Sequence, residues 1–390
     1  MDLTFEMVKK NAIFKDRHVL TELKPPGGKF VHRENQKKEL ILELAPLLSS
    51  QRASNLFVYG VPGTGKTALM SYLADELKTH ATRDGVPMQT VYVNCSTAKT
   101  DTLILLAVLR QLSPKHKIPK AGVNRSTVIR QFLKHLKDEA LNLLIVLDEI
   151  DMALKSSGDD ILYFLSRVKD DPRVRTNVCT VIISNDVKVP SYLQPKTQSS
   201  FGRSKIVFPR YDADELTAIL RDRAKHAFCD GVLAEGVIQK IAALEARSGG
   251  DAREACELLY ACGKTVIATG QNQVTLGVVD SAHKHLESDT LLNVICLLTL
   301  HQKLLLRALL ECPKPTSTSN AAFSDYLSLC HHANTPPLSR RRIQSFLVQF
   351  DDANLIASQM GYDKSLGKKT RCITIPYPKE VVAKVLARLR

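Results

Sequence analysis

One stretch, "NLFVYGVPGTGKTALM" at residues 55–70, constrains the fold more than any other part of the chain. Apolar β-forming residues lead into a glycine-containing loop, and the segment after the loop carries apolar residues at helical spacing. The loop fits GxxxxGK[ST], a pattern that wraps backbone N–H groups around a phosphate at a helix N-terminus. Glycine costs conformational entropy on folding, so its use here indicates a close approach of the backbone to a ligand. A flexible surface loop is the alternative, and the strand and helix on either side argue against it.

The chemistry of phosphate binding gives the residues of this loop their expected roles. Lys66 can reach the β- and γ-phosphates of a nucleotide, and the Thr67 hydroxyl can ligate Mg²⁺. The chain is therefore predicted to bind ATP or ADP with Mg²⁺. The predicted cofactor-binding residues are Gly60, Val61, Pro62, Gly63, Thr64, Gly65, Lys66, Thr67 and Ala68.

A second apolar run supplies the acids that such a site needs. "LNLLIVLDEID" has five consecutive apolar residues, 143–147, directly before Asp148 and Glu149. Asp148 is expected to hold Mg²⁺, directly or through water, and Glu149 to orient or activate the attacking water. A strand that merely ends at the surface in two acids is the alternative. The glycine loop, about 80 residues upstream, favours the site.

Two further polar residues fit a hydrolysis site. "TVIISND" places Asn185 just past a strand expected beside the other two, within reach of the γ-phosphate, although alone it would be a turn residue. "SGGDAREACELL" places Arg253 in the first turn of a helix, where a cation opposes the helix dipole. A negatively charged ligand would account for that position. An ordinary solvated arginine is the alternative.

The order of the apolar runs predicts an α/β fold for the first half of the chain. Short runs alternate with helical segments, which is typical of a parallel sheet covered by helices. From residue 212 to about 286 the pattern is helical throughout, and a third section of helices and late strand-like pieces follows. The strands are expected at 55–59, 90–94, 143–147, 178–183 and 205–208.

The net charge of +14 is the unusual feature of the composition, because 54 Lys+Arg face only 40 Asp+Glu. Such a surplus indicates a polyanionic partner, either nucleic acid or an anionic membrane, or else a basic surface with no partner. No apolar stretch is long enough for a membrane span. The nine cysteines form no CxxC pair, so an intracellular, reduced, soluble protein without a zinc site is expected.

The surplus is concentrated near the C-terminus, where residues 290–390 hold 14 Lys+Arg and 6 Asp+Glu. "PPLSRRRIQSFLVQFDDANLI" predicts a helix with Ser339 as its N-cap, and three arginines then fall in its first turn. Cations there oppose the helix dipole, but a recognition helix entering a major groove would use them. These predicted DNA-binding residues are Arg340, Arg341 and Arg342.

Downstream, strand-like pieces around "ASQM" and "CITIP" flank a basic loop, so that a wing can reach phosphates or a minor groove. Helix plus basic hairpin is the winged-helix arrangement, which can also bind protein. A further basic segment, "SPKHKIPKAGVNRSTVIRQFL", is either a DNA contact or an ordinary surface loop. The predicted wing residues are Lys364, Lys368, Lys369 and Arg371, and the further segment holds Lys115, Lys117, Lys120, Arg125 and Arg130.

Together these motifs resemble the AAA+ ATPases and, more narrowly, the archaeal Orc1/Cdc6 replication initiators. The glycine loop, "LLIVLDEID", "ISND" and "GDAR" occur in the family's order, and "IFKDRHVL", "HRENQ" and "IVFPRY" are similar to the subfamily pattern. The resemblance implies an AAA+ parallel-sheet ATPase domain at 1–210, a helical lid at 211–288 and a winged-helix domain at 289–390. It also implies that the basic segment before Arg125 contacts the minor groove.

Carried over residue by residue, the resemblance makes Asp148 and Glu149 the metal and water acids, Asn185 sensor 1 and Arg253 sensor 2. The "HRE" at residues 32–34 resembles the segment beside the adenine. The family function is ATP-dependent binding of double-stranded origin DNA, with loading of the replicative helicase and further initiator subunits on the DNA. A cytoplasmic, nucleoid-associated protein is therefore expected, or a nuclear one in a eukaryote.

One position departs from the family pattern. Lys196 stands where the family places an arginine that acts on the neighbouring subunit, and Arg203 is nearby but shifted. Lysine lacks the planar bidentate contact of arginine, so a slow ATPase switch is expected rather than a motor. Two alternatives stay open: a DNA-binding regulator with a structural, non-hydrolysing nucleotide site, and a clamp-loader-like AAA+ subunit.

Overall fold

The computed structural model describes residues 13–49, 51–113, 124–201, 204–312, 317–353, 355–363, 368–377 and 382. The chain divides into two compact units, residues 1–279 and 280–390, and each is described by itself. The three-domain division expected at residues 210 and 288 stays a prediction. Within the described ranges, no helix combines the length and apolarity needed to cross a membrane.

The first unit is built on a five-stranded parallel sheet in the order β2-β3-β4-β1-β5. Every residue of β3 is buried, as expected for a parallel strand covered by helices on both faces. The five predicted strands and the α/β class are thus confirmed, with ends shifted by at most two residues. The strands are β1 (Leu56–Tyr59), β2 (Met88–Asn94), β3 (Asn142–Asp148), β4 (Asn177–Ser184) and β5 (Ser204–Val207).

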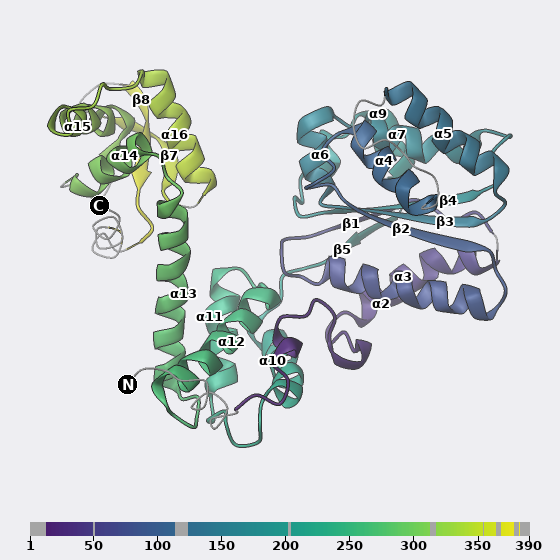
Figure 1. Cartoon of the computed structure of the whole chain (residues 1–390), viewed down its shortest axis with the longest axis horizontal. Coiled ribbons are helices and arrows are strands. Elements are labelled where there is room, and N and C mark those ends of the chain that lie inside the picture. Colours follow the sequence, from purple (N-terminus) through teal and green to yellow (C-terminus); the bar gives the residue numbers. More distant parts are fainter. Residues whose placement is uncertain are drawn as a thin grey trace. The chain divides into compact units, whose positions relative to one another are not determined.

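Helices cover both faces of this sheet (Figure 1). One face carries α2 (Glu34–Leu44) and α3 (Lys66–Arg83), whose apolar residues share a core with β1 and β4. The other face carries most of the remaining helices and encloses the second core. These are α4 (Asp101–Leu112), α5 (Arg125–Asp138), α6 (Ile150–Ser157), α7 (Asp160–Arg167), α8 (Val189–Tyr192) and α9 (Pro195–Phe201), with the short 3₁₀ turn η4 (Val168–Asp170). The turn η3 (Ala45–Ser49) packs with α2 and α3 on the first face.

A helical part follows the sheet in the same unit. Asp212 and Glu215 form a capping box at the start of α10, as the acidic opening of that segment predicts. The N-terminal cap of α12 is Asp251. The helices are α10 (Ala213–Ala227), α11 (Val237–Ser248), α12 (Ala252–Thr269) and the beginning of α13 (Leu276–Cys296), which continues past residue 288.

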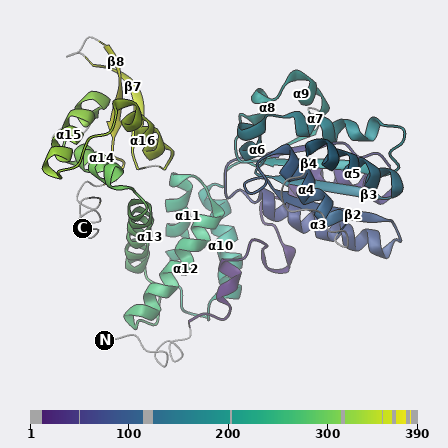
Figure 2. The ribbon, with the colours of Figure 1, turned by 45° about the horizontal axis from the view of Figure 1, so that its top comes forward.

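Residues 13–23, which the sequence analysis includes in the domain at 1–210, pack on α10 and α12. The backbone of residues 13–15 bonds that of residues 227–229, and the Phe14 ring lies 4.7 Å from the ring of Phe228 and 5.8 Å from that of Tyr260. Figures 1 and 2 show this purple segment beside α10. It includes η1 (Arg17–Leu20) and leads to η2 (Pro26–Gly28).

Among its described residues, the second unit combines the C-terminal part of α13 and three further helices with a small antiparallel sheet in the order β6-β8-β7 (Figure 2). The predicted helix begins at Arg340 with Ser339 as its N-cap, and the two late strands form a hairpin. Strand β6 was not predicted, because two residues are too short for a recognisable alternation. The elements are α14 (Leu300–Glu311), β6 (Ser317–Thr318), α15 (Ser319–His332), α16 (Arg340–Asp352), β7 (Ala357–Asp363) and β8 (Lys368–Thr374).

Candidate functional site

The glycine loop connects β1 to α3, as predicted, at the carboxyl end of the sheet. Gly65, at φ 89°, is the N-cap of α3, and Gly63 has φ 67°; both values lie in the left-handed region that favours glycine. A Cβ at Gly63 would stand 1.7 Å from a carboxylate oxygen of Asp251. The glycine is therefore required by the approach of α12 as well as by the turn.

Lys66 is buried within the loop that precedes it. Its Nζ donates to the backbone carbonyl oxygens of Gly60 at 2.8 Å and Val61 at 2.7 Å. Burial lowers the pKa of Lys66 to about 8, although nearby carboxylates, chiefly Asp148, raise it. An ammonium group held in a desolvated loop gains strongly from a phosphate placed against it.

Asp148 ends β3, and both oxygens of its buried carboxylate accept hydrogen bonds. Oδ1 accepts from the Glu149 backbone N–H at 2.8 Å, and Oδ2 accepts from the Tyr92 hydroxyl of β2. Glu149 itself has φ 53°, a left-handed backbone that is costly for a residue with a Cβ. Such strain next to the predicted metal acid is typical of functional sites.

Asn185 follows β4, which pairs with both β1 and β3, so the expectation that this strand lies beside the other two is confirmed. The Asp151 carboxylate accepts from the Asn185 backbone N–H at 3.2 Å and from the Ser184 hydroxyl at 3.1 Å. Asp151 thus fixes the turn that carries Asn185. Its sequence signal was the third acid of "LDEID", which the motif analysis left without a role.

The N-terminus of α12 brings Arg253 to the glycine loop. The Asp251 carboxylate caps the helix through the backbone N–H groups of Arg253 (2.7 Å) and Glu254 (3.3 Å), while the Ala252 N–H donates to the Gly63 carbonyl at 3.2 Å. The Arg253 side chain is exposed and lines the same cavity as the loop.

That cavity has a volume of about 440 Å³. Its walls come from six segments, which are residues 20–31, the glycine loop, the residue directly after β3, the residue directly after β4, α12, and α10 together with Tyr211 just before it. Of the predicted site residues, its lining contains Pro62, Gly63, Gly65, Lys66, Thr67, Ala68, Glu149, Asn185 and Arg253. Both halves of the predicted site, the glycine loop and the polar residues after β3 and β4, therefore lie around one cavity that is large enough for a small ligand.

Two arginines hold the walls of the site together. Arg33, which the resemblance places in the segment beside the adenine, is fully buried. It donates to the Thr64 carbonyl at 3.0 Å and the Pro209 carbonyl at 2.7 Å, and its guanidinium lies 3.7 Å from the Tyr211 ring centroid. These contacts join the glycine loop to the connection into α10, and the place beside an adenine stays a prediction. Arg223 of α10 is the second arginine, and the sequence analysis did not single it out.

Arg223 fixes the N-terminal wall of the cavity. Its guanidinium donates to the backbone carbonyls of Val19, Glu22 (2.9 Å) and Leu23 (3.4 Å). Because Leu20, Glu22 and Leu23 line the cavity, this one side chain from α10 fixes the wall that residues 20–23 form.

The residues present fit a magnesium ion at this site. The Thr67 hydroxyl and the Asp148 carboxylate are hard oxygen donors, and Mg²⁺ is commonly held by one or two such groups together with substrate phosphates. The buried Asp148 carboxylate has no cationic partner among its recorded hydrogen bonds. It therefore retains negative charge to offer an ion.

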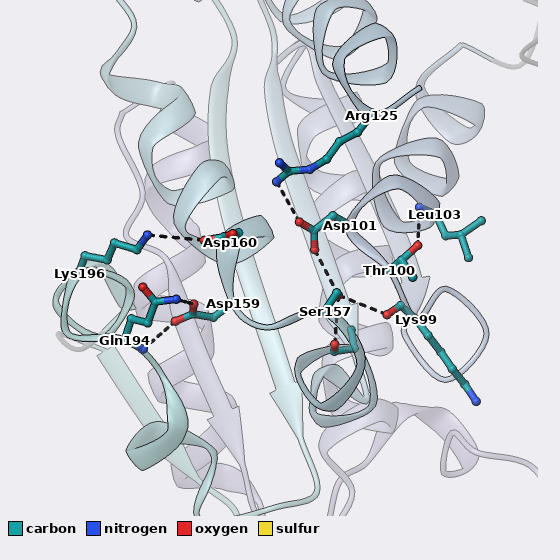
Figure 3. A network of polar contacts seen from close by, with 11 residues as sticks. Lys99, Thr100, Asp101, Leu103, Arg125, Ser157, Asp159, Asp160, Gln194 and Lys196 are labelled. Carbon is teal, nitrogen blue, oxygen red and sulfur yellow. Dashed lines mark hydrogen bonds and ion pairs between the residues drawn. The ribbon is translucent and has the colours of Figure 1, made fainter. Parts of the chain in front are cut away.

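Figure 3 shows how two other predicted residues are held. Arg125, at the start of α5, donates to the Asp101 carboxylate at 2.9 Å, and Asp101 also bonds Ser157. Lys196 of α9 lies 3.5 Å from the Asp160 carboxylate, with its Nζ 4.8 Å from the Tyr163 ring centroid. Both cations thus have partners within their own chain, and their expected roles stay predictions. Lys115, Lys117, Lys120 and Arg203 lie outside the described residues.

The second unit exposes the predicted arginines at the start of α16. Arg340 bonds the Asn320 side chain and lies 5.6 Å from the Phe323 ring, and Arg342 lies 5.1 Å from the Phe346 ring. Arg341 makes no side-chain contact recorded among the described residues. On the hairpin, Lys368, Lys369 and Arg371 belong to β8, whereas Lys364 lies outside the described residues.

Three family models match the chain in sequence order: an AAA domain at residues 18–186, a Cdc6 AAA+ ATPase-type lid domain at 217–284 and a CDC6 C-terminal winged helix domain at 293–385. An ORC1-type DNA replication protein of Thermococcus onnurineus (strain NA1) is 36% identical over 386 residues, covering 97% of this chain and 92% of the relative. The chain belongs to the ORC1-type DNA replication proteins.

Further relatives support this family assignment. ORC1-type DNA replication protein 1 of Sulfolobus acidocaldarius is 34% identical over 389 residues, which are 98% of this chain and 95% of the relative. The solved structure of the Aeropyrum pernix ORC1 protein in complex with DNA superposes with a TM-score of 0.84 at 30% identity, covering 96% and 97% of the two chains. The predicted resemblance, the AAA+ fold and the winged helix are therefore confirmed.

Proposed function

We propose that this ORC1-type protein is an ATP-dependent replication initiator that binds double-stranded origin DNA. The observation that carries the proposal is the convergence of the glycine loop, Glu149, Asn185 and Arg253 on one cavity, in a chain that also carries exposed arginines on a winged helix. The similarity along nearly the whole chain to an ORC1 protein solved with DNA supports it. The protein would act on chromosomal DNA together with further initiator subunits and help to load the replicative helicase.

In this proposal each residue of the cavity has a defined task toward ATP. Lys66 leaves the loop carbonyls and neutralises the β- and γ-phosphates, aided by the backbone N–H groups of the loop. Thr67 and Asp148 would hold Mg²⁺, which supplies charge neutralisation on the phosphates. Glu149 takes a proton from the attacking water, and Asn185 holds that water and the γ-phosphate in line.

Arg253 would couple the presence of the nucleotide phosphates to the position of the lid helices. It stands next to Asp251, whose carboxylate caps α12 and lies against Gly63. An anion on the glycine loop repels that carboxylate and attracts Arg253, so nucleotide state biases how α12 meets the loop. We assign slow turnover to the protein, because Lys196 is held by Asp160 and lacks the fork geometry of arginine.

The DNA-binding unit would insert the start of α16 into a major groove. Arg341 is the arginine left with no recorded side-chain contact, whereas Arg340 and Arg342 are held against neighbouring rings. The hairpin residues Lys368, Lys369 and Arg371 would reach phosphates, and Lys364 and Arg125 are further proposed contacts. The clamp-loader alternative loses support, because the C-terminal unit is a winged helix rather than an all-helical collar.

Footprinting on genomic fragments tests this proposal, with wild type and Arg341→Ala in ATP and in ADP. We expect discrete protected sites that Arg341→Ala weakens or erases. Arg307→Ala is the matched control, since Arg307 is an arginine of the same unit whose side chain is paired with Glu311. Uniform weak protection, insensitive to the Arg341 substitution, would contradict specific DNA recognition by α16.

A DNA-binding regulator with a structural nucleotide is the second candidate, favoured by the partnered Lys196. It differs from the first in one respect, which is whether hydrolysis changes the state of the protein. If Glu149→Gln leaves both nucleotide release and DNA affinity unchanged, the regulator is the better description.

A further inference from the structure

Tyr92 is a polar residue of the site for which the proposed mechanism has so far given no task. It lies on β2, paired in register with Val146 of β3, so its side chain and that of Asp148 project from the same face of neighbouring strands. The hydroxyl reaches Oδ2 of Asp148 across that pair. The contact therefore follows directly from sheet register.

The backbone of Tyr92 is fixed independently of that contact. Strand β2 is an edge strand, and on its free side the Gln111 side chain of α4 accepts from the Tyr92 N–H at 3.1 Å and donates to the Tyr92 carbonyl at 2.9 Å. A side-chain amide thus replaces the missing neighbouring strand at this one residue. The two bonds fix the position from which the hydroxyl projects.

The direction of the hydrogen bond at the hydroxyl follows from its partner. An ionised carboxylate only accepts, so the Tyr92 hydroxyl donates its hydrogen to Asp148. The other Asp148 oxygen accepts from the Glu149 backbone N–H at 2.8 Å, so the rotation of the carboxylate is fixed from two sides. Burial raises the pKa of Tyr92, and the Asp148 carboxylate raises it further.

We propose that Tyr92 is a positioning residue of the magnesium site, which fixes the rotation of the Asp148 carboxylate through the hydrogen bond that it donates. Because Oδ2 is held by Tyr92 and Oδ1 by the Glu149 N–H, the remaining lone pairs of Asp148 keep one fixed direction. This inference rests on the proposed binding of nucleotide with Mg²⁺.

The alternative is a purely structural role, in which Tyr92 only satisfies a buried carboxylate. The two roles differ in their dependence on the metal. A positioning residue changes how nucleotide affinity responds to Mg²⁺, whereas a structural residue changes stability and affinity with or without Mg²⁺.

The test measures binding of a fluorescent ADP analogue to the full chain, first in EDTA and then across a Mg²⁺ titration. For Tyr92→Phe we expect affinity in EDTA within about twofold of wild type, and a Mg²⁺ midpoint about tenfold higher, the low end for groups that orient metal ligands. The matched control is Tyr59→Phe, a tyrosine of the same sheet whose ring stacks on Phe57. A Tyr92→Phe midpoint equal to that of wild type would overturn the inference.

A second variant guards against a change in folding and tests the contact itself. In an Asp148→Asn background, the further change Tyr92→Phe should shift the Mg²⁺ midpoint by less than about twofold, because coupled residues are not additive. Additive effects would overturn the link through Asp148. A wild type that binds ADP equally with and without Mg²⁺ would overturn the inference alone, whereas one that binds no nucleotide would overturn the proposed function.

Discussion

The cations of the two units are held in opposite ways. Around the cavity, Lys66, Arg33 and Arg223 all donate to backbone carbonyls. Lys66 bonds the loop directly before it, whereas the two arginines bond segments distant in sequence. At the start of α16 the arginines are exposed, and Arg341 has no recorded partner among the described residues. The first set fixes the shape of a site before any ligand arrives. In the proposed DNA complex, the second set would contribute charge and reach and would take its final geometry against the DNA.

Glu149→Gln gives the largest expected effect, because it removes the base while keeping the cavity. ATP hydrolysis, followed by phosphate release, should fall by about a hundredfold or more. ADP affinity should stay within about twofold, since the amide has the same shape. Glu139→Gln, an exposed glutamate at the end of α5, is the control and should leave hydrolysis unchanged. Unchanged hydrolysis in the Glu149 variant would show that another group activates the water.

Arg33→Ala tests whether a carbonyl-bound cation maintains the structure of the first unit. The substitution leaves the buried Thr64 carbonyl and the Pro209 carbonyl without this donor, and we expect about 3 kcal/mol less free energy of unfolding in urea. Arg52→Ala, an exposed arginine of the same unit, should change it by less than about 0.5 kcal/mol. Equal effects of the two substitutions would remove the distinction between the two kinds of cation.

Arg341→Ala should show the opposite behaviour, with weaker DNA binding and unchanged stability. We expect DNA affinity to fall roughly tenfold, the loss of one direct contact, at an unfolding free energy within about 0.5 kcal/mol of wild type. Binding isotherms at several salt concentrations would separate its role further. A log–log salt slope smaller by about one indicates a phosphate contact, whereas an unchanged slope with relaxed sequence preference indicates a base contact.

The pH dependence of ADP affinity gives the smallest effect and probes the desolvation of Lys66. Its pKa is lowered to about 8, and only the charged form attracts phosphates. Affinity should therefore be nearly constant below that value and fall as pH rises through it, about fourfold between pH 7 and pH 8.5. Calorimetry in buffers of different ionisation enthalpy should show proton uptake on binding. A Lys66→Arg variant that still binds should lose this dependence, and its persistence would assign it to another group.

The parts of the molecule predicted from sequence are those encoded by short segments. The glycine loop, the acids after β3 and the five strands follow from local patterns of apolar and special residues, and the structure confirms the strands. The same holds for α16 and the hairpin of the winged helix, where apolar spacing and a proline break mark the elements.

The contacts that were missed join residues far apart in the sequence. The contact of Arg33 with Pro209 spans 176 positions, and that of Arg223 with Val19 spans 204. The local sequence does not distinguish Tyr92 from the other β-forming residues around it. Only the register of β2 with β3 brings its hydroxyl to Asp148. No pattern within a helix or a strand contains this information, because it arises from how the elements pack.

The packing of residues 13–23 against α10 and α12 also sets an order of events during synthesis. Phe14 leaves the ribosome more than 200 residues before Phe228 and Tyr260, the rings it contacts. Gly263, where a Cβ would stand 2.2 Å from the Phe14 ring, follows later still. The nascent chain must therefore carry an aromatic segment without its packing partners while the sheet is completed. Contacts between residues so far apart in sequence slow folding, because the long loop between them must close first. Translation of α12 is the first moment at which the cavity can exist.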